Sequence, residues 1–282
     1  MPPRPLSPRL FRIPLPNTPR CIRHRSSSSL DPSEVQHFNQ LASEWWDPHG
    51  SSRLLHLMNP LRLRFIESCL RSSPVTEPPD SPASTPEIAR SRTNRRFLDV
   101  GCGGGILAES LARLPTTESV LAIDPTPGVL DIAKAHMRTD PALKRKLQYR
   151  ASTIEDVLEE EMFDVVTTME VVEHVTSPFP FLQSCLTHVR PGGWLIGSTI
   201  ARHPVSYITT KLIAEDVMRI VPRGTHDWNK YVNAGELEGF FAGEREVVEC
   251  RVLGCVYVPG FGWREVRGSE RVGNYFFGVR KR

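Results

Sequence analysis

Three side chains that could bind a metal ion or carry a proton lie close together in residues 169–175. Glu170, Glu173 and His174 are three or four residues apart, so they would point the same way if this segment is helical. Two carboxylates and an imidazole can hold a divalent cation and leave positions open for oxygen ligands. The alternative is that the acids begin a helix and His174 serves as a general base without a metal.

A glycine cluster follows a run of strand character and could bring the backbone close to a ligand. Residues 97–100 lead into Gly101, Gly103 and Gly105, which lack a Cβ and tolerate positive φ. The dinucleotide fingerprint places its third glycine where this chain has Ile106. The cluster is therefore a weak match to a loop that holds a pyrophosphate.

An acidic residue stands about twenty residues beyond the glycines, where a nucleoside ribose would lie. Asp124 follows a second expected strand, residues 119–123, and its carboxylate could accept both ribose hydroxyls. The glycine turn and this acid suit S-adenosylmethionine, which has a ribose but no pyrophosphate. The alternative is a glycine-rich turn in some other α/β protein.

The cation site and the methyl donor together would suit methyl transfer to a phenol. A phenolic hydroxyl has a pKa near ~10 and is mostly protonated at neutral pH. A bound cation favours the phenolate and orients the two oxygens of a catechol, and the reacting oxygen must then lie in line with the sulfonium methyl. His174 could take the proton, as could His226, although His226 equally suits a structural turn.

Strand-like and helical segments alternate from residue 96 onward, which predicts an α/β fold. We expect a doubly wound, mostly parallel seven-stranded sheet whose C-terminal edge is an antiparallel hairpin. An acid in the loop 152–156 could meet the adenine amino group. The expected helices are 106–114 and 127–138, and the expected strands include 97–100, 119–123, 147–150, 163–168 and 194–199, with the hairpin formed by 246–257 and 273–279.

Two helices are expected before the first strand, within residues 31–70. Asn59 and Pro60 suit the start of the second one, as a cap followed by proline at the first helical position. Arg62 on this helix could reach a cofactor carboxylate as a two-pronged donor. Trp45 and Trp46, in the turn between the helices, suit either core packing or contact with a substrate.

The N-terminal residues 1–30 have the composition of an organellar transit peptide, being rich in arginine and serine and free of acids. A disordered basic tail is the alternative. Without these residues the chain carries fewer basic than acidic side chains, so we expect no binding to nucleic acid. The six cysteines form no C-x-x-C pair and suit free thiols in a reducing compartment such as the mitochondrial matrix.

Two inserts are expected in the remaining domain, residues 31–282. Residues 71–95 are rich in proline and serine and have the composition of a disordered insert. The insert 201–232 contains an amphipathic helix over 207–221. Its apolar face could pack on the domain, cover an apolar substrate or lie on a membrane surface. No apolar run approaches the length of a membrane span.

Several motifs resemble those of the ubiquinone-biosynthesis O-methyltransferases, a family with the class I methyltransferase fold. The glycine motif, Asp99 to Glu109, alone indicates only a methyltransferase. The motifs that begin at Trp45, Asn59 and Val221 are far more specific to this family. The matching segments are Trp45-Trp-Asp-Pro48, Asn59-Pro-Leu-Arg-Leu63, Asp99 to Glu109, Met169 to Val175, Arg190-Pro-Gly-Gly193 and Val221 to Asp227.

This resemblance implies a mitochondrial enzyme that methylates hydroxyls of a polyprenylated ring at two steps, on polyprenyl dihydroxybenzoate and on demethylubiquinol. It implies a peripheral protein on the matrix face of the inner membrane that works in a complex with other ubiquinone-biosynthesis proteins. His174 and Glu170 would be catalytic. The implied S-adenosylmethionine contacts are Arg62, Gly101, Asp124 and Met169, with Gly103 beside them in the glycine turn, and the implied Mg²⁺ ligands are Glu170, Glu173 and His174.

Two other functions fit the same residues. One is a metal-independent methyltransferase for a different small molecule. The other is a non-catalytic scaffold that binds the cofactor within a mitochondrial complex.

Overall fold

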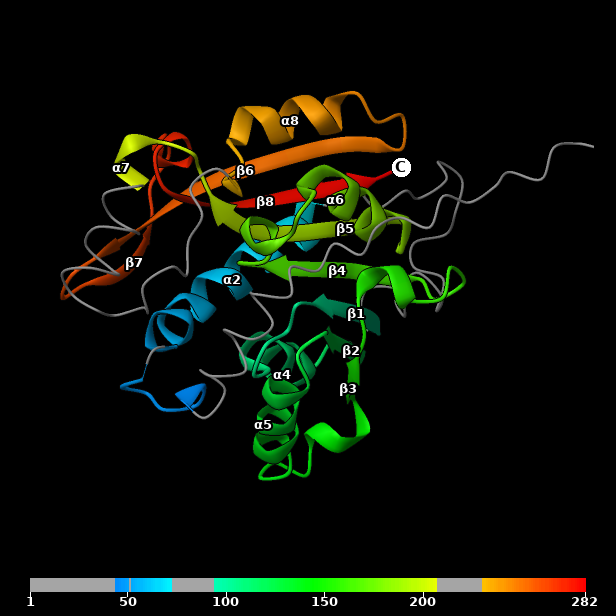
Figure 1. Cartoon of the computed structure of the whole chain (residues 1–282). Coiled ribbons are helices and arrows are strands. Elements are labelled where there is room, and N and C mark those ends of the chain that lie inside the picture. Colours follow the sequence, from blue (N-terminus) through cyan, green and yellow to red (C-terminus); the bar gives the residue numbers. More distant parts are fainter. Residues whose placement is uncertain (1–43, 51, 73–93, 207–229) are drawn as a thin grey trace, which may run out of the picture.

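The computed structural model describes residues 44–50, 52–72, 94–206 and 230–282 (Figure 1). Several expected features lie outside these residues. They are the transit peptide at 1–30, the first helix, most of the inserts 71–95 and 201–232, the amphipathic stretch 207–221, and His226. Within the described part of the chain, no helix is long and apolar enough to span a membrane.

The centre of the fold is an eight-stranded sheet with the order β3-β2-β1-β4-β5-β8-β6-β7. The first five strands of that order are parallel, while β8, β6 and β7 pair antiparallel. The strands are β1 (Arg95–Val100), β2 (Thr117–Asp124), β3 (Leu147–Ala151), β4 (Phe163–Met169), β5 (Val189–Ile200), β6 (Val247–Val258), β7 (Gly262–Glu265) and β8 (Asn274–Lys281).

The expected number of seven strands was one too few, because the short strand β7 was missed. Gly260 and Gly262 adopt positive φ of 80° and 74°, which lets the chain reverse tightly after β6. Tyr257 then pairs with Trp263 across the hairpin. The Trp263 indole donates to the carbonyl of Leu54 at 3.0 Å, which fixes β7 against the N-terminal helix.

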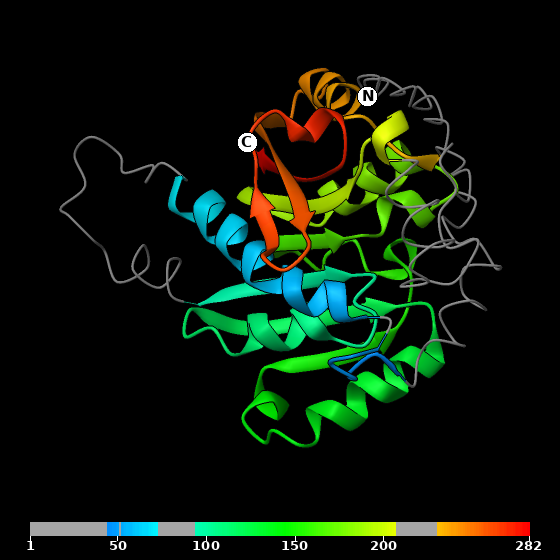
Figure 2. The same cartoon turned by 90° about the vertical axis from the view of Figure 1, so that its left-hand side faces the viewer.

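Helices cover both faces of the sheet, as expected for a doubly wound fold (Figure 2). One core cluster joins the sheet to α2 (Arg53–Ser72), α4 (Ile106–Ala112) and α5 (Pro127–Met137). The other joins it to α6 (Pro178–Thr187) and α8 (Ala234–Ala242). Neighbouring residues in β1 serve opposite faces, since Phe97 belongs to the first cluster and Leu98 to the second. This two-sided burial explains the continuous apolar runs of the parallel strands.

The second N-terminal helix begins earlier than its sequence predicts. α2 starts at Arg53 and contains Pro60 in its interior, whereas Asn59 and Pro60 were expected at its start. An interior proline removes one backbone hydrogen bond and costs about 3 kcal/mol. The buried face continues on both sides of it, through Met58 and Leu61, so packing on the sheet outweighs that cost.

The five described cysteines are free thiols, as expected. Four of them are buried, and burial raises the pKa of Cys69 to about 12. A buried thiol with so high a pKa is unreactive.

Candidate active site

The glycine turn after β1 has the backbone conformation that its sequence predicts. Gly101, Gly103 and Gly105 adopt φ of 70°, 52° and 87°. The N–H groups of Gly101 and Cys102 both donate to the carbonyl of Ile123, at 2.9 and 3.0 Å, so the turn is joined to the end of β2. A side chain at Gly101 would meet Val171 at 2.5 Å, which excludes any larger residue there.

Asp124 lies against this turn, as expected. Its carboxylate accepts hydrogen bonds from the backbone N–H of Gly103 at 3.0 Å and of Thr126 at 2.8 Å. These bonds favour the ionised form, while burial raises the pKa of Asp124. A carboxylate offers about four acceptor positions. Asp124 can therefore still accept both hydroxyls of a ribose.

The loop after β3 is tied to Asp124 and carries the acid expected near an adenine. The N–H of Ser152 donates to the carbonyl of Asp124 at 3.2 Å. The 3-10 turn η3 (Ile154–Asp156) follows, and the carboxylate of Asp156 accepts a hydrogen bond from the hydroxyl of Thr153. The buried Oε2 of Glu155 has no hydrogen-bond partner in the described residues, and Asp156 keeps acceptor positions, so either acid could meet the adenine amino group.

Arg62 and Asp99, which stands two residues before Gly101, are both buried and interact electrostatically. The carboxylate of Asp99 accepts from the hydroxyl of Thr167 at 2.7 Å, and burial raises its pKa to about 7. Burial lowers the pKa of Arg62, while Glu170, Asp99 and Glu173 oppose this shift. Arg62 Nε and Asp99 Oδ2 have no hydrogen-bond partner among the described residues. A buried donor and acceptor without partners indicate a site for a ligand that carries both charges.

Met169 ends β4, and Glu170 directly after it has an unusual backbone. Among the described residues, Glu170 is the one non-glycine residue with a positive φ, at 57°. Its N–H donates to the carbonyl and to the hydroxyl of Ser198, both at 3.1 Å. Its carboxylate accepts from Ser198 at 2.6 Å and from Asn274 at 3.4 Å. These contacts hold the residue in a conformation that costs about 1–3 kcal/mol, as often found at functional sites.

The segment after Glu170 is not a continuous helix. The expectation that Glu170, Glu173 and His174 point the same way depended on such a helix. Positive φ at Glu170 breaks the helical pattern, and only the 3-10 turn η4 (Val172–His174) forms. Glu173 is buried in this turn and accepts from Thr199 at 2.8 Å. Burial and the charge of Glu170 raise the pKa of Glu173 to about 7, and His174 opposes that rise. The three side chains thus share an electrostatic environment without sharing a helix face.

The three expected metal ligands do not form a chelating cluster. Within residues 44–50, 52–72, 94–206 and 230–282, no three His, Cys, Asp or Glu side chains are arranged to hold a metal ion. Glu170 and Glu173 still feel each other's charge. Two nearby carboxylates are enough for Mg²⁺, which usually keeps several waters and binds through one or two carboxylates.

Comparison with known proteins places this arrangement in a family. A family model described as a methyltransferase domain matches residues 98–197. The mitochondrial ubiquinone biosynthesis O-methyltransferase of Candida albicans is 42% identical, with 91% of this chain and 87% of that protein covered. The chain belongs to the ubiquinone biosynthesis O-methyltransferase family. The resemblance seen in the sequence is thereby confirmed.

Solved structures agree on the fold. A possible histamine N-methyltransferase from Thermotoga maritima, described as dependent on S-adenosylmethionine, superimposes with a TM-score of 0.53 at 16% identity, covering 88% of this chain and 100% of that one. The plantazolicin methyltransferase, solved with S-adenosylhomocysteine, gives 0.51 at 15% identity, covering 89% and 97%. At these identities the comparison shows the class I methyltransferase fold alone, which confirms the expected fold class.

Four polar residues that contact Asp99, Glu170 or Glu173 were not predicted from the sequence. Ser198 and Thr199 end an apolar strand, and the parallel pairing of Met169 with Ser198 sets them beside Glu170 and Glu173. Hydroxyls at the carboxyl end of a buried strand are a signal that could have been used. Thr167 and Asn274 gave no such signal, because only tertiary structure brings them to Asp99 and Glu170.

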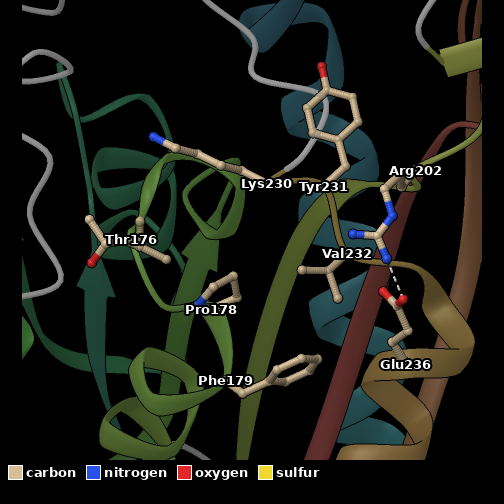
Figure 3. A pocket seen from close by; sticks show the side chains of 9 residues that line it. Thr176, Pro178, Phe179, Arg202, Lys230, Tyr231, Val232 and Glu236 are labelled. Carbon is tan, nitrogen blue, oxygen red and sulfur yellow. Dashed lines mark hydrogen bonds and ion pairs between the residues drawn. The ribbon is translucent and has the colours of Figure 1, made fainter.

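We call residues 170–174, which carry Glu170, Glu173 and His174, the acidic turn. A pocket of about 280 Å³ opens next to it (Figure 3). Its wall begins at Val175, the residue after His174, and includes the apolar side chains of Phe179 and Val232. Arg202 and Glu236 form an ion pair at its edge. The complete lining is Val175, Thr176, Pro178, Phe179, Arg202, Lys230, Tyr231, Val232 and Glu236.

Proposed function

We propose that this chain transfers the methyl group of S-adenosylmethionine to a phenolic hydroxyl of polyprenylated catechols in ubiquinone biosynthesis. The observation that carries the proposal is the pair of unpartnered buried atoms, Arg62 Nε and Asp99 Oδ2, beside the glycine turn that binds Asp124. The substrates would be polyprenyl dihydroxybenzoate and demethylubiquinol. Membership of the family supports this choice.

Each polar part of the cofactor has a matching group. Arg62 suits the carboxylate of the methionine moiety, and Asp99 suits its ammonium group. Asp124 suits the ribose hydroxyls, and one of the two acids of η3 suits the adenine amino group. Gly101 packs closely against Val171, and its backbone would line the cofactor crevice, while Met169 at the end of β4 would contribute an apolar surface there.

His174 is the proposed acceptor of the phenolic proton. Glu173 interacts electrostatically with His174, and its negative charge would stabilise the imidazolium that forms. Glu170 is held by Ser198 and Asn274 at the rim of the same site. The remaining contribution of the protein is alignment of the oxygen with the sulfonium methyl and exclusion of water.

Magnesium is part of the proposal, with Glu170 and Glu173 as the residues that would hold it. Each accepts at least one hydrogen bond and keeps acceptor positions for a cation. A bound Mg²⁺ would stabilise the phenolate form of the substrate. His174 would then serve as the base.

The prenyl chain of the substrate would enter the pocket between Val175 and Val232, since an apolar chain gains by leaving water there. We further propose a peripheral position on the matrix face of the mitochondrial inner membrane, in contact with other ubiquinone-biosynthesis proteins. The mitochondrial relatives and the composition of residues 1–30 support the mitochondrial part.

A methylation assay on a short-chain prenyl dihydroxybenzoate tests the proposal. We expect turnover by the purified chain, loss with a chelator and recovery with Mg²⁺. Turnover that survives the chelator would favour the metal-independent alternative. A chain that binds S-adenosylhomocysteine but methylates no catechol would contradict the proposed function, and cells complemented by an Asp124→Ala variant would favour the scaffold.

A further inference from the structure

Two adjacent tryptophans pack on the glycine turn from outside the sheet. The indole of Trp45 is buried and covers Gly103 and Gly104. A Cβ on Gly103 would lie 2.3 Å from the indole Cζ2, and one on Gly104 would lie 2.1 Å from Cδ1. The close fit explains why Gly104 is a glycine, although no positive φ requires one there.

Trp46 joins the same turn, through His136, to the buried carboxylate of Glu109. Its indole N–H donates to the carbonyl of Gly104 at 2.8 Å. Its ring stacks flat on the imidazole of His136, with centroids 3.4 Å apart and planes inclined by 3°. His136 Nδ1 lies 2.8 Å from the carboxylate of Glu109, which also accepts from Arg113 at 2.9 Å.

The N-terminal helix holds the tryptophans from their other side. His56 on α2 contacts the edge of the Trp46 ring, with centroids 5.2 Å apart at 62°. Its Nε2 lies 2.9 Å from the carbonyl of Trp45. Asn59, one turn further along α2, donates to Ser110 on α4 at 2.8 Å. Residues 44–50 are therefore fixed between α2, α4 and α5.

We propose that Trp45 and Trp46 are positioning residues of the cofactor site, which fix Gly103 and Gly104 so that Asp124 is directed at the ribose. This role depends on the cofactor site proposed above. Gly103 links the two parts, because its N–H donates to Asp124 at 3.0 Å while its Cα lies under Trp45.

The physical reason is preorganisation. Glycines lose more conformational freedom on ordering than other residues. If the tryptophans order this turn in the free protein, the cofactor need not do so on binding and therefore binds more tightly. Neither indole needs to touch the cofactor for this effect.

Replacing Trp46 with Phe tests the hydrogen bond alone, because Phe keeps a ring on His136 and removes the N–H donor. We expect the Kd for S-adenosylhomocysteine to rise roughly three- to tenfold, as for loss of one hydrogen bond. The KM for S-adenosylmethionine should rise equally while kcat changes little. A loss confined to kcat, or an unchanged Kd, would overturn the proposal.

Trp263→Phe is the matched control. Trp263 also donates its indole N–H to a backbone carbonyl, that of Leu54 at 3.0 Å, but it contacts α2 rather than the glycine turn. We expect a similar decrease in stability but a clearly smaller rise in the Kd for S-adenosylhomocysteine than in Trp46→Phe, because Trp263 is connected to the glycine turn only through α2. Equal weakening in both variants would show that only general stability matters. Failure of the unsubstituted chain to bind S-adenosylhomocysteine would instead contradict the proposed function.

A second cycle of variants tests Trp45. Gly104→Ala introduces a Cβ that collides with Trp45, so it should weaken binding of S-adenosylhomocysteine at least about tenfold. In a Trp45→Leu background the collision is removed, and the same substitution should cost roughly threefold or less, since contacting residues are not additive. Equal losses in the two backgrounds would overturn the role of Trp45.

Discussion

The backbone N–H of Gly103 donates to the carboxylate of Asp124 across 3.0 Å, joining the glycine turn after β1 to the end of β2. One bond thus links the two sequence features that predict a nucleoside site. Asp124→Asn should weaken binding of S-adenosylhomocysteine about 10- to 100-fold, because hydrogen bonds to a charged group are lost. Titration calorimetry measures the Kd, and Asp164→Asn, at the far end of β4, serves as a control.

Arg62→Met should weaken cofactor binding and leave three acidic residues without their nearby cation. Asp99, Glu170 and Glu173 all interact with this guanidinium. We expect the KM for S-adenosylmethionine to rise more than tenfold, since breaking a buried charge interaction costs several kcal/mol. Arg62→Lys should restore part of the affinity, because it keeps the charge but not the planar fork. Equal KM values for Arg62→Met and the unsubstituted chain would contradict this role.

The acidic turn should make stability depend on pH. The pKa of Glu173 is raised from its ordinary 4.5 to about 7, so the folded chain binds more protons than the unfolded one between these values. Its contribution is therefore present below pH ~4.5 and is lost as the pH rises through 7, by on the order of 3 kcal/mol. Denaturant titrations at several pH values measure this.

Glu173→Gln should remove that part of the pH dependence and leave the part due to Asp99, whose pKa is also raised to about 7. The decisive comparison is the free energy of unfolding at pH 4.5 and at pH 8 in both proteins. An unchanged slope in the variant would mean that Glu173 ionises normally.

Magnesium should stabilise the folded chain above pH 7, where Glu170 and Glu173 repel each other most strongly. A cation that binds only the folded state raises the melting temperature by mass action. We expect MgCl₂ to raise it more than NaCl of equal ionic strength, and Glu173→Gln to abolish the difference. The same response in both proteins would contradict a magnesium site at these residues.

The pocket next to the acidic turn should distinguish prenylated from unprenylated substrates. Phe179→Ala removes apolar surface from its wall. We expect the KM for a prenylated catechol to rise several-fold, while that for the unprenylated ring stays near its original value. Phe261→Ala is the control, because Phe261 is 71% exposed at the turn between β6 and β7. A similar change for both substrates would place the prenyl chain elsewhere.

The parallel strands could be predicted because their signals are local. Runs such as residues 97–100 and 163–168 consist mostly of apolar and β-branched residues, and the structure extends them by a residue or two. Local rules failed where tertiary contacts decide the conformation. Pro60 should begin a helix but lies inside one, because the buried face of α2 continues on both sides of it, through Met58 and Leu61.

The candidate active site, like the fold, could be predicted where its signals are local and not where tertiary contacts decide the conformation. Glycine and acid spacing identified Gly101, Gly103 and Asp124 correctly as neighbours, since they follow adjacent parallel strands. The assumed helix after Met169 was wrong, because hydrogen bonds between Glu170 and both Ser198 and Asn274 hold Glu170 at positive φ. No pattern in residues 169–175 could reveal partners that lie 28 and 104 positions away.

The position of β8 has a consequence for the order of assembly. Although it is the last described strand in the sequence, it lies inside the sheet between β5 and β6 and carries Asn274, the partner of Glu170. During synthesis the parallel half could form first, and the edge of β5 would stay unpaired until β8, which follows β6 and β7 in the sequence, has left the ribosome. A nascent chain stopped before residue 274 should therefore remain sensitive to protease and bind no catechol.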